Sequence, residues 1–190
     1  MLKIGVLALQ GAFLEHSKKI TKLGAQPIEI RQVKDLHKDL AGIILPGGES
    51  TTQGKMLRDL DLLEPLRERI KTGLPVLGTC AGLILLANKV TNDQTTHLAT
   101  LPVSVTRNAY GRQLGSFMTD LDVKNIGTIS ATFIRAPYVN QISQEVEILA
   151  SYQGKIVAVK YKNQIGLSFH PELNKDDSIH TYFLDFCQKN

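Results

Sequence analysis

Residues 75–86 read Pro-Val-Leu-Gly-Thr-Cys-Ala-Gly-Leu-Ile-Leu-Leu, an apolar strand pattern that runs straight into an apolar helix pattern. The first part, Pro75–Gly78, predicts a short buried strand, and the residues after Cys80 predict a helix. Strands that lead directly into helices are typical of α/β folds, in which helices cover a sheet of parallel strands. The glycines at 78 and 82 leave room for the sharp backbone turn that such a junction needs.

Strand and helix patterns also alternate upstream of this junction. Further strands are expected at Lys3–Leu9, Ile28–Arg31 and Ala41–Leu45, and helices at Ala12–Leu23, from about Thr51, and across Leu63, Leu66 and Ile70 as far as Gly73. Ser50 and Gln53 have the spacing of a capping box at the start of the helix near Thr51. Repeated strand–helix units imply parallel strands with helices on both faces of the sheet.

From about Pro102 the pattern changes to short segments rich in Val, Ile, Tyr and Thr. These segments are Val103–Val105, Thr128–Ile134, Val146–Tyr152, Ile156–Tyr161 and Ile165–Phe169. They suggest hairpins or an extension of the sheet in mixed directions. A closing helix carries Ile179, Tyr182, Phe183 and Phe186 on one face. The expected fold class is therefore α/β: a mostly parallel central sheet with helices on both faces, plus a mixed or antiparallel extension.

The composition indicates one folded domain over residues 1–190. Of the 190 residues, 43% are hydrophobic and 21% are charged, which is enough apolar sequence for a full core and excludes a disordered protein. The net charge of +4 is spread along the chain, which argues against nucleic-acid binding. No apolar run reaches the ~20 residues of a membrane span, and no cleavage site follows the apolar start. We expect a soluble, cytoplasmic protein with no membrane partner.

The segment Gly78-Thr79-Cys80-Ala81-Gly82 has the composition of a nucleophile elbow. A thiol at this place lies at a helix N-terminus, whose dipole favours the thiolate. The backbone amide of Ala81 would then face an oxyanion formed at a substrate carbonyl. The alternative is a buried structural cysteine in a turn bounded by glycines.

Two further motifs follow predicted strands. His170-Pro171-Glu172 comes after Ile165–Phe169, so that His170 could accept the proton of Cys80 while Glu172 holds its tautomer. An ordinary turn histidine is the alternative, and a zinc site is disfavoured because no Pro-Cys-x-x-Cys segment accompanies the motif.

Pro46-Gly47-Gly48-Glu49-Ser50 also ends a strand, and its glycines allow backbone amides to approach a ligand closely. A tight turn would explain Pro-Gly-Gly equally well, and no Gly-Lys-Ser/Thr follows as in a Walker loop. Because α/β folds place ligands at strand ends, the three motifs together supply the parts for acyl transfer from an amide.

Taken in this order, the three motifs resemble the class I (triad) glutamine amidotransferases. Longer strings resemble, more narrowly, the PdxT/SNO family of glutaminase subunits of pyridoxal 5′-phosphate synthase: Gly5–Ala12 with Glu15-His16, Leu45–Thr52, Arg107–Gln113, Phe133–Pro137 and Ser168–Leu173. The resemblance covers essentially the whole chain, and these strings are highly specific. It implies the flavodoxin-like architecture of that class.

The resemblance also implies a mechanism. Glutamine would be hydrolysed through a γ-glutamyl thioester on Cys80, with His170 as base and then as acid, and with Glu172 orienting it. The oxyanion hole would be formed by Gly48 and Ala81, and glutamine would be bound by Gly47, Gly48, Glu49, Arg107, Ile134 and Arg135, with no metal or other cofactor. Without the family, both arginines would be interpreted as solvated surface residues.

The implied partner is a (β/α)₈-barrel synthase subunit of the PdxS type in a large hetero-oligomer. That subunit would use the ammonia to make pyridoxal 5′-phosphate from ribose 5-phosphate and glyceraldehyde 3-phosphate. The family's glutaminases are activated by docking, with the backbone near Gly47-Gly48 and the Gln10-Gly11 turn implicated.

Three other functions stay open at this stage. The glutaminase subunit of imidazole glycerol phosphate synthase shares the triad, the size and the need for a barrel partner, although Leu9–Ala12 and Arg107–Gln113 favour the vitamin B6 assignment. A catalytically silent adaptor is disfavoured because Cys80, His170 and Glu172 are intact. A nucleic-acid binder is disfavoured by the charge distribution.

Overall fold

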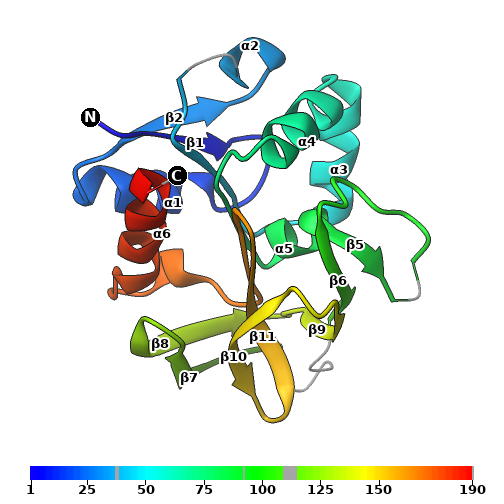
Figure 1. The fold of residues 1–190 in the computed structure, drawn as a ribbon, viewed down its shortest axis with the longest axis vertical. Coiled ribbons are helices and arrows are strands. Elements are labelled where there is room, and N and C mark those ends of the chain that lie inside the picture. The colour runs from blue at the N-terminus through cyan, green and yellow to red at the C-terminus, as the bar shows by residue number, and fades with distance from the viewer. Residues whose placement is uncertain (37–38, 92, 109–114, 190) are drawn as a thin grey trace.

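A computed structural model describes residues 1–36, 39–91, 93–108 and 115–189 (Figure 1). Its elements are β1 (Lys3–Leu7), α1 (Phe13–Lys22), β2 (Gln26–Ile30), α2 (Val33–Leu36), β3 (Gly42–Leu45), α3 (Ser50–Asp59), α4 (Leu63–Lys71), β4 (Val76–Thr79), α5 (Ala81–Leu86), β5 (Ala87–Val90), β6 (Leu101–Thr106), β7 (Ser116–Val123), β8 (Gly127–Ile134), β9 (Tyr138–Ile142), β10 (Glu147–Tyr152), β11 (Lys155–Tyr161), β12 (Gln164–Leu167), the 3₁₀ helix η2 (Pro171–Leu173) and α6 (Ser178–Lys189). Every element expected from the sequence is present, with ends shifted by a few residues.

The large sheet has the strand order β2-β1-β3-β4-β12-β11-β9-β6-β5, and β10 pairs with β11. The strands from β2 to β12 run parallel to one another. Beyond β12, the pairs β12–β11, β11–β9 and β9–β6 are antiparallel, and β5 runs parallel to β6. The expected fold class, a mostly parallel sheet with a mixed extension, is confirmed.

Helices cover both faces of the parallel part, as Figure 1 shows. Successive residues of β3 point to opposite faces: Ile43 and Leu45 belong to one core cluster and Ile44 to the other. The first cluster also contains residues of α3, α4 and α5, and the second contains residues of α1, α6 and β8. A parallel strand buried on both faces reads as a continuous apolar run, which is why these strands are visible in the sequence.

The hairpin of β7 and β8 forms a second, two-stranded antiparallel sheet. Phe133 on β8 is fully buried, stacks on Phe117 of β7 at 4.8 Å between ring centroids, and contacts Phe169 at 5.7 Å. Because Phe169 directly precedes His170, this packing fixes the hairpin against the chain that leaves β12. The hairpin therefore contributes to the site from outside the main sheet.

The expected capping box at the start of α3 is wrong. Glu49 is the residue that precedes the helix, and its side chain makes no capping hydrogen bond. The Gln53 side chain instead donates to the carbonyl oxygens of Gln10 and Pro46, at 2.9 and 3.1 Å. Backbone carbonyls that the fold removes from water need donors, so a tertiary contact takes the side chain that the local pattern had assigned to the cap.

None of the helices in the described ranges is long and apolar enough to cross a membrane.

Candidate active site

The three motifs that the sequence marked meet at one edge of the sheet. β4 lies between β3 and β12 and is parallel to both. The carboxyl ends of parallel neighbours lie at the same edge of the sheet. At this edge β3 leads into Pro46–Glu49, β4 leads into Cys80, and β12 leads into His170. The topology thus assembles side chains that are far apart in the sequence.

Cys80 sits on a strained turn between β4 and α5. Its backbone has φ 50° and ψ −102°, a conformation that L-residues rarely adopt and that surrounding contacts must hold. One such contact is the hydrogen bond that the Cys80 amide donates to the Leu167 carbonyl, at 2.8 Å. A Cβ atom on Gly82 would collide with the Leu45 carbonyl, so α5 can begin this close to β3 only with glycine there. This is the geometry of a nucleophile elbow.

His170 is held from two sides. Its backbone amide donates to the Thr132 carbonyl of β8 at 2.8 Å. Its ring atom Nδ1 lies 2.6 Å from Glu172 Oε1, in the 3₁₀ turn that follows. Burial alone would lower the pKa of His170, but hydrogen bonding and charge from Cys80 and Glu172 outweigh it and raise that pKa to about 10. His170 is therefore an imidazolium at neutral pH.

Glu172 is almost fully buried and carries a negative charge. Burial would raise its pKa, but His16 and then the hydrogen bond and charge of His170 act in the other direction, and the pKa lies below its usual value. An ionised carboxylate accepts hydrogen bonds only, so the His170 atom Nδ1 must bear the proton that faces it. The other ring nitrogen, Nε2, is left for chemistry.

The Gly47-Gly48 segment is tied to the start of α1. The Gly47 carbonyl accepts a hydrogen bond from the Ala12 amide at 3.0 Å, and Gln10 Oε1 accepts one from the Glu49 amide at 2.8 Å. In a trans peptide the C=O and the following N–H point in opposite directions. The Gly48 N–H therefore points away from Ala12. Both residues that were expected to supply the oxyanion hole, Gly48 and Ala81, line the same cavity.

This cavity, of about 240 Å³, contains the thiol. Its lining is Gln10, Gly48, Glu49, Ser50, Cys80, Ala81, Ile84, Arg107, Asn108, Ile134, Arg135 and His170. Pockets for drug-sized ligands hold roughly 300–1,000 Å³, so this one suits a smaller molecule. Of the expected site residues, Gly47 and Glu172 do not line it: both lie behind the His170 ring, which a Cβ on Gly47 would strike.

Sequence reasoning had not assigned Gln10, Ser50, Ile84 or Asn108 to the substrate cavity. Gln10 had been connected only with docking, through the Gln10-Gly11 turn. Each of these residues lies within or beside one of the motifs, so proximity to a motif is the signal that could have found them.

The two arginines that were expected to bind substrate stand at the cavity. Arg107 is held by Asp93, with Nη1 3.4 Å from Oδ2, and its Nη2 lies 3.3 Å from Thr51 Oγ1. Arg135 is exposed and follows the end of β8. The carbonyl of Ile134 lies 4.0 Å from Cys80 Sγ. Positions 109–113 of the string Arg107–Gln113 lie outside the described residues.

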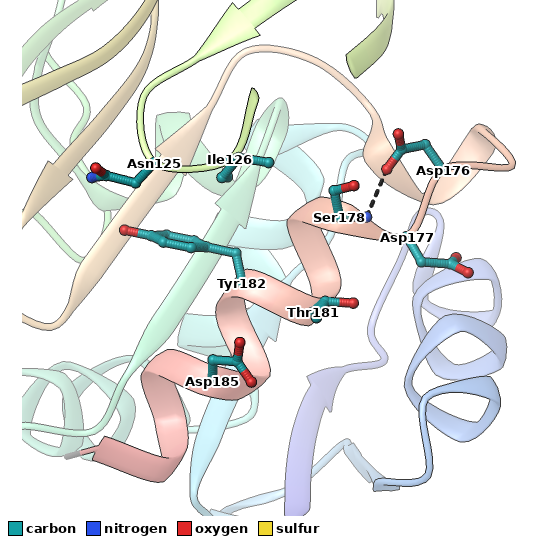
Figure 2. Close-up of a pocket in the computed structure, with 8 residues that line it drawn as sticks. All are labelled: Asn125, Ile126, Asp176, Asp177, Ser178, Thr181, Tyr182 and Asp185. Atoms are coloured by element: carbon teal, nitrogen blue, oxygen red, sulfur yellow. Dashed lines mark hydrogen bonds between the residues drawn. The ribbon is translucent and has the colours of Figure 1, made fainter. Parts of the chain in front are cut away.

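A second hollow, of about 530 Å³, lies beside α6 and carries three carboxylates but neither the thiol nor His170 (Figure 2). Asp177 is already paired with Lys19, at 2.6 Å, and with Lys22. Asp176 accepts a hydrogen bond from the Ser178 amide at 2.6 Å. Within the described ranges, no group of three or more His, Cys, Asp or Glu side chains could hold a metal ion. The cavity at Cys80 is therefore the candidate active site.

Comparison with known families gives a match over nearly the whole chain. The model of the SNO glutamine amidotransferase family matches residues 6–189. The chain belongs to this family. The resemblance inferred from the motifs is thereby confirmed.

Named relatives and solved structures agree with this membership. The "Pyridoxal 5'-phosphate synthase subunit PdxT" of Desulfitobacterium hafniense is 61% identical over 184 residues, which is 97% of this chain and 92% of that protein. A protein of the same name from Streptococcus pneumoniae is 52% identical over 191 residues, covering 99% and 98%. A solved "glutamine amidotransferase" superposes with a TM-score of 0.93 at 41% identity, covering 97% and 98%.

A more distant solved structure shares the fold alone. It is a chain of the PurLQS structure from Thermotoga maritima, with a TM-score of 0.72, 16% identity, and coverage of 97% of this chain and 98% of that one. The fold is thus found in a protein whose sequence has little identity with this chain.

Proposed function

We propose that this chain is the glutaminase subunit of a pyridoxal 5′-phosphate synthase, in which Cys80, His170 and Glu172 form the catalytic triad. It hydrolyses L-glutamine to L-glutamate and ammonia and delivers the ammonia to the synthase subunit. The observation that carries the proposal is geometric: at the carboxyl ends of adjacent parallel strands, Cys80 stands on a strained turn after β4, and His170, after β12, has Nδ1 2.6 Å from Glu172 Oε1. Family membership supplies the substrate.

Substrate binding uses charge and backbone groups. Arg107 and Arg135 attract the α-carboxylate of glutamine, for which a guanidinium offers paired donors. Backbone groups of Gly48 and Glu49 and the Ile134 carbonyl contact the rest of the molecule, while Gly47, which lies behind the His170 ring, contributes through the turn that positions Gly48. The Ile134 carbonyl, 4.0 Å from Cys80 Sγ, is an acceptor suited to an N–H donor of the substrate.

The first chemical step forms a thioester. The Cys80 thiolate attacks the side-chain amide carbon of glutamine, and the carbonyl oxygen becomes an oxyanion held by the Gly48 and Ala81 amides. His170 Nε2 gives its proton to the amide nitrogen as the C–N bond breaks, so ammonia leaves and a γ-glutamyl thioester remains. Because His170 is already protonated, its first role in this chain is that of an acid.

The second step releases glutamate. Neutral His170 now takes a proton from a water molecule, whose oxygen attacks the thioester carbon. The tetrahedral intermediate collapses, the C–S bond breaks and the thiolate returns beside the imidazolium. Glu172 stays ionised throughout and holds His170 in one tautomer.

The partner is a synthase subunit of the PdxS type. We infer that it is a (β/α)₈ barrel in a large hetero-oligomer, that the chain docks as one domain over residues 1–190, and that docking raises the glutaminase rate. Two hydrogen bonds support activation by docking: the Glu49 amide donates to Gln10, and the Ala12 amide donates to the Gly47 carbonyl. A partner that shifts the start of α1 would therefore also shift the backbone of the oxyanion hole.

The decisive experiment measures ammonia release from glutamine by the purified chain, alone and with a pyridoxal 5′-phosphate synthase barrel subunit. Strong stimulation that disappears in Cys80→Ala is the expected result. Release that depends on Cys80 but responds only to the barrel subunit of imidazole glycerol phosphate synthase would move the enzyme to another pathway. No release under any condition would leave a silent adaptor as the better explanation.

A further inference from the structure

Two fully buried histidines lie behind the triad and take no part in the reaction described above. His16 is on α1 and His180 is on α6, and both side chains are 0% exposed. His16 Nδ1 lies 2.9 Å from His180 Nε2. His16 Nε2 lies 3.2 Å from Thr79 Oγ1 and 3.4 Å from Glu172 Oε2. One imidazole thus faces both the residue before the nucleophile and the acid of the triad.

The second oxygen of Glu172 needs this neighbour. Oε1 is occupied by His170, whereas Oε2 is buried and has no hydrogen-bond partner of ordinary geometry within the described ranges. A buried carboxylate oxygen with no compensating dipole is strongly destabilising. The His16 Nε2 atom, 3.4 Å away, is the polar group placed to compensate it.

The protonation of the two histidines follows from their surroundings. Burial lowers the pKa of His16 in spite of the Glu172 charge, and burial lowers the pKa of His180 to about 2, so both rings are neutral. A neutral ring has one N–H. The ionised Glu172 can only accept, which places the His16 proton on Nε2 and makes Nδ1 an acceptor. His180 must then donate from Nε2, and its Nδ1, which has no partner among the described atoms, is the unprotonated nitrogen.

The charged groups around the pair do not change this assignment. Glu15, Lys19 and His170 act on His16 in addition to Glu172, and Lys19 and Asp177 act on His180. Lys19 and Asp177 form an ion pair at 2.6 Å and act on the pKa of His180 in opposite directions, whereas on His16 Lys19 acts in the same direction as burial and so supports the neutral ring.

We propose that His16 is a positioning residue for the glutaminase reaction, with His180 as the group that fixes its tautomer. His180 Nε2–H donates to His16 Nδ1, and His16 Nε2 faces Glu172 Oε2 at 3.4 Å, which favours the ionised carboxylate in the orientation where Oε1 meets His170. His16 Nε2 also faces Thr79, the residue before Cys80. His16 therefore fixes the position of the turn at Cys80 relative to Glu172. The kinetic consequences of this inference rest on the proposed function. The tautomer assignment rests only on the contacts of His16 and His180.

The kinetic test compares His16→Leu, which removes the donor, with His16→Gln, which keeps an amide N–H near the position of Nε2. In the complex with the synthase subunit, we expect His16→Leu to lower kcat about tenfold, the size typical of losing a group that orients a catalytic ligand. KM for glutamine should not change. The acid limb of the pH profile should move to higher pH, because Glu172 Oε2 loses the neighbouring N–H dipole of His16 that favours the ionised carboxylate. His16→Gln should recover most of the rate.

The control variant is His97→Leu. His97 is also buried, with its pKa lowered by burial, but it contacts Arg58 rather than the triad. Its kcat and pH profile should match the unchanged protein. If His16→Leu also matches, or if the Leu and Gln variants are equally slow with an unchanged pH profile, His16 has only a structural role and the proposal is wrong.

A measurement on the unchanged chain covers the case in which His16→Leu does not fold. Long-range ¹H–¹⁵N correlation NMR reports which ring nitrogen of His16 and of His180 bears the proton. Nε2–H on both is expected, and Nδ1–H on His16 would overturn the proposal. This result does not require activity, so it separates failure of the inference from failure of the glutaminase assignment.

Discussion

The two cysteines of the chain are buried to the same degree and differ in everything else. Cys80 is 7% exposed and Cys187 is 6% exposed. Cys80 stands on a strained turn at the sheet edge, beside the charged His170. Cys187 lies on α6 among the apolar residues of the second core cluster, and burial raises the pKa of its thiol to about 12.

The difference shows that burial alone does not decide what a thiol can do. Removal from water disfavours the charged form of any cysteine, and Cys187 has no cation within the described structure to offset that. At Cys80 the fold places an imidazolium, whose own charge is stabilised by a buried carboxylate. Reactivity therefore follows from the neighbouring charges, which the strand order sets.

The largest contrast is expected from removing each thiol in turn. Cys80→Ala should reduce glutamine hydrolysis by more than about 10³-fold, because no other group can form the thioester. Cys187→Ala should keep nearly full activity, since it removes only one sulfur atom from the core. Ammonia release in the complex measures both. Equal loss in the two variants, with both folded by circular dichroism, would contradict the comparison.

Alkylation sharpens the contrast without any substitution. Iodoacetamide reacts with accessible thiolates; Cys80 lines a cavity, whereas Cys187 lies in the apolar core with its pKa raised to about 12, so Cys187 should react at least about a hundredfold more slowly until the chain is unfolded. Peptide mass spectrometry after timed labelling gives the two rates. Saturating glutamine should slow labelling of Cys80 only, and faster labelling of Cys187 than of Cys80 would be incompatible with this structure.

Two glycines test the surroundings of each cysteine in a matched way. A Cβ on Gly47 would strike the His170 ring, and a Cβ on Gly42 would strike Cys187 Sγ and approach Phe183. Gly47→Ala should cut activity at least about tenfold with little change in melting temperature, because it displaces a catalytic side chain. Gly42→Ala should destabilise the fold by about 1–3 kcal/mol, as overpacking does, and leave the activity of the folded fraction intact. Thermal unfolding and ammonia release are measured on both variants. Lost stability with full activity in Gly47→Ala, or lost activity with full stability in Gly42→Ala, would contradict the prediction.

The smallest effect is a shift in titration. In Cys80→Ala, His170 loses the hydrogen bond and charge of the thiol while burial still disfavours its proton, so its pKa should fall from about 10. In Cys187→Ala it should not move. Ring NMR signals followed against pH measure the shift, and an unchanged His170 in Cys80→Ala would mean that the thiol does not interact with it.

The same pKa has a consequence for stability. Its folded value of about 10 lies above the ordinary 6.5, so protonated His170 stabilises the fold fully below pH 6.5, and this contribution is lost as the pH rises to about 10. The decrease in the free energy of unfolding between pH 6.5 and about pH 10 should be smaller in Cys80→Ala. Unfolding in denaturant at several pH values reads it out.

The first half of the chain could be predicted almost element by element. Strands β1, β3 and β4 are buried on both faces, and their continuous apolar runs end at Gly or Pro. The elements that were missed are α2, β5, β7, β9 and the three-residue 3₁₀ helix η2. The helix α2 has only four residues, and β5, β7 and β9 each expose several side chains, so none carries a strong apolar signal.

The site, like the fold, could be predicted only where residues that are neighbours in the chain carry the signal. The three motifs were visible because a nucleophile elbow and a glycine-rich turn need particular residues next to one another in the chain. The failed capping box shows the opposite case: Ser50 is already inside the helix, and the carbonyls of Gln10 and Pro46, brought close by the fold, bind the Gln53 side chain.

The sequence by itself indicated the fold class, the proposed nucleophile Cys80 and the two turns that surround it, because each depends on residues that are neighbours in the chain. Only the tertiary structure decided how those parts are charged and held. His16 and His180 are 164 residues apart, yet their rings meet behind Glu172. No local pattern records such a contact, since it arises from the order in which parallel strands and their helices pack, and that order sets the electrostatic environment of every buried group.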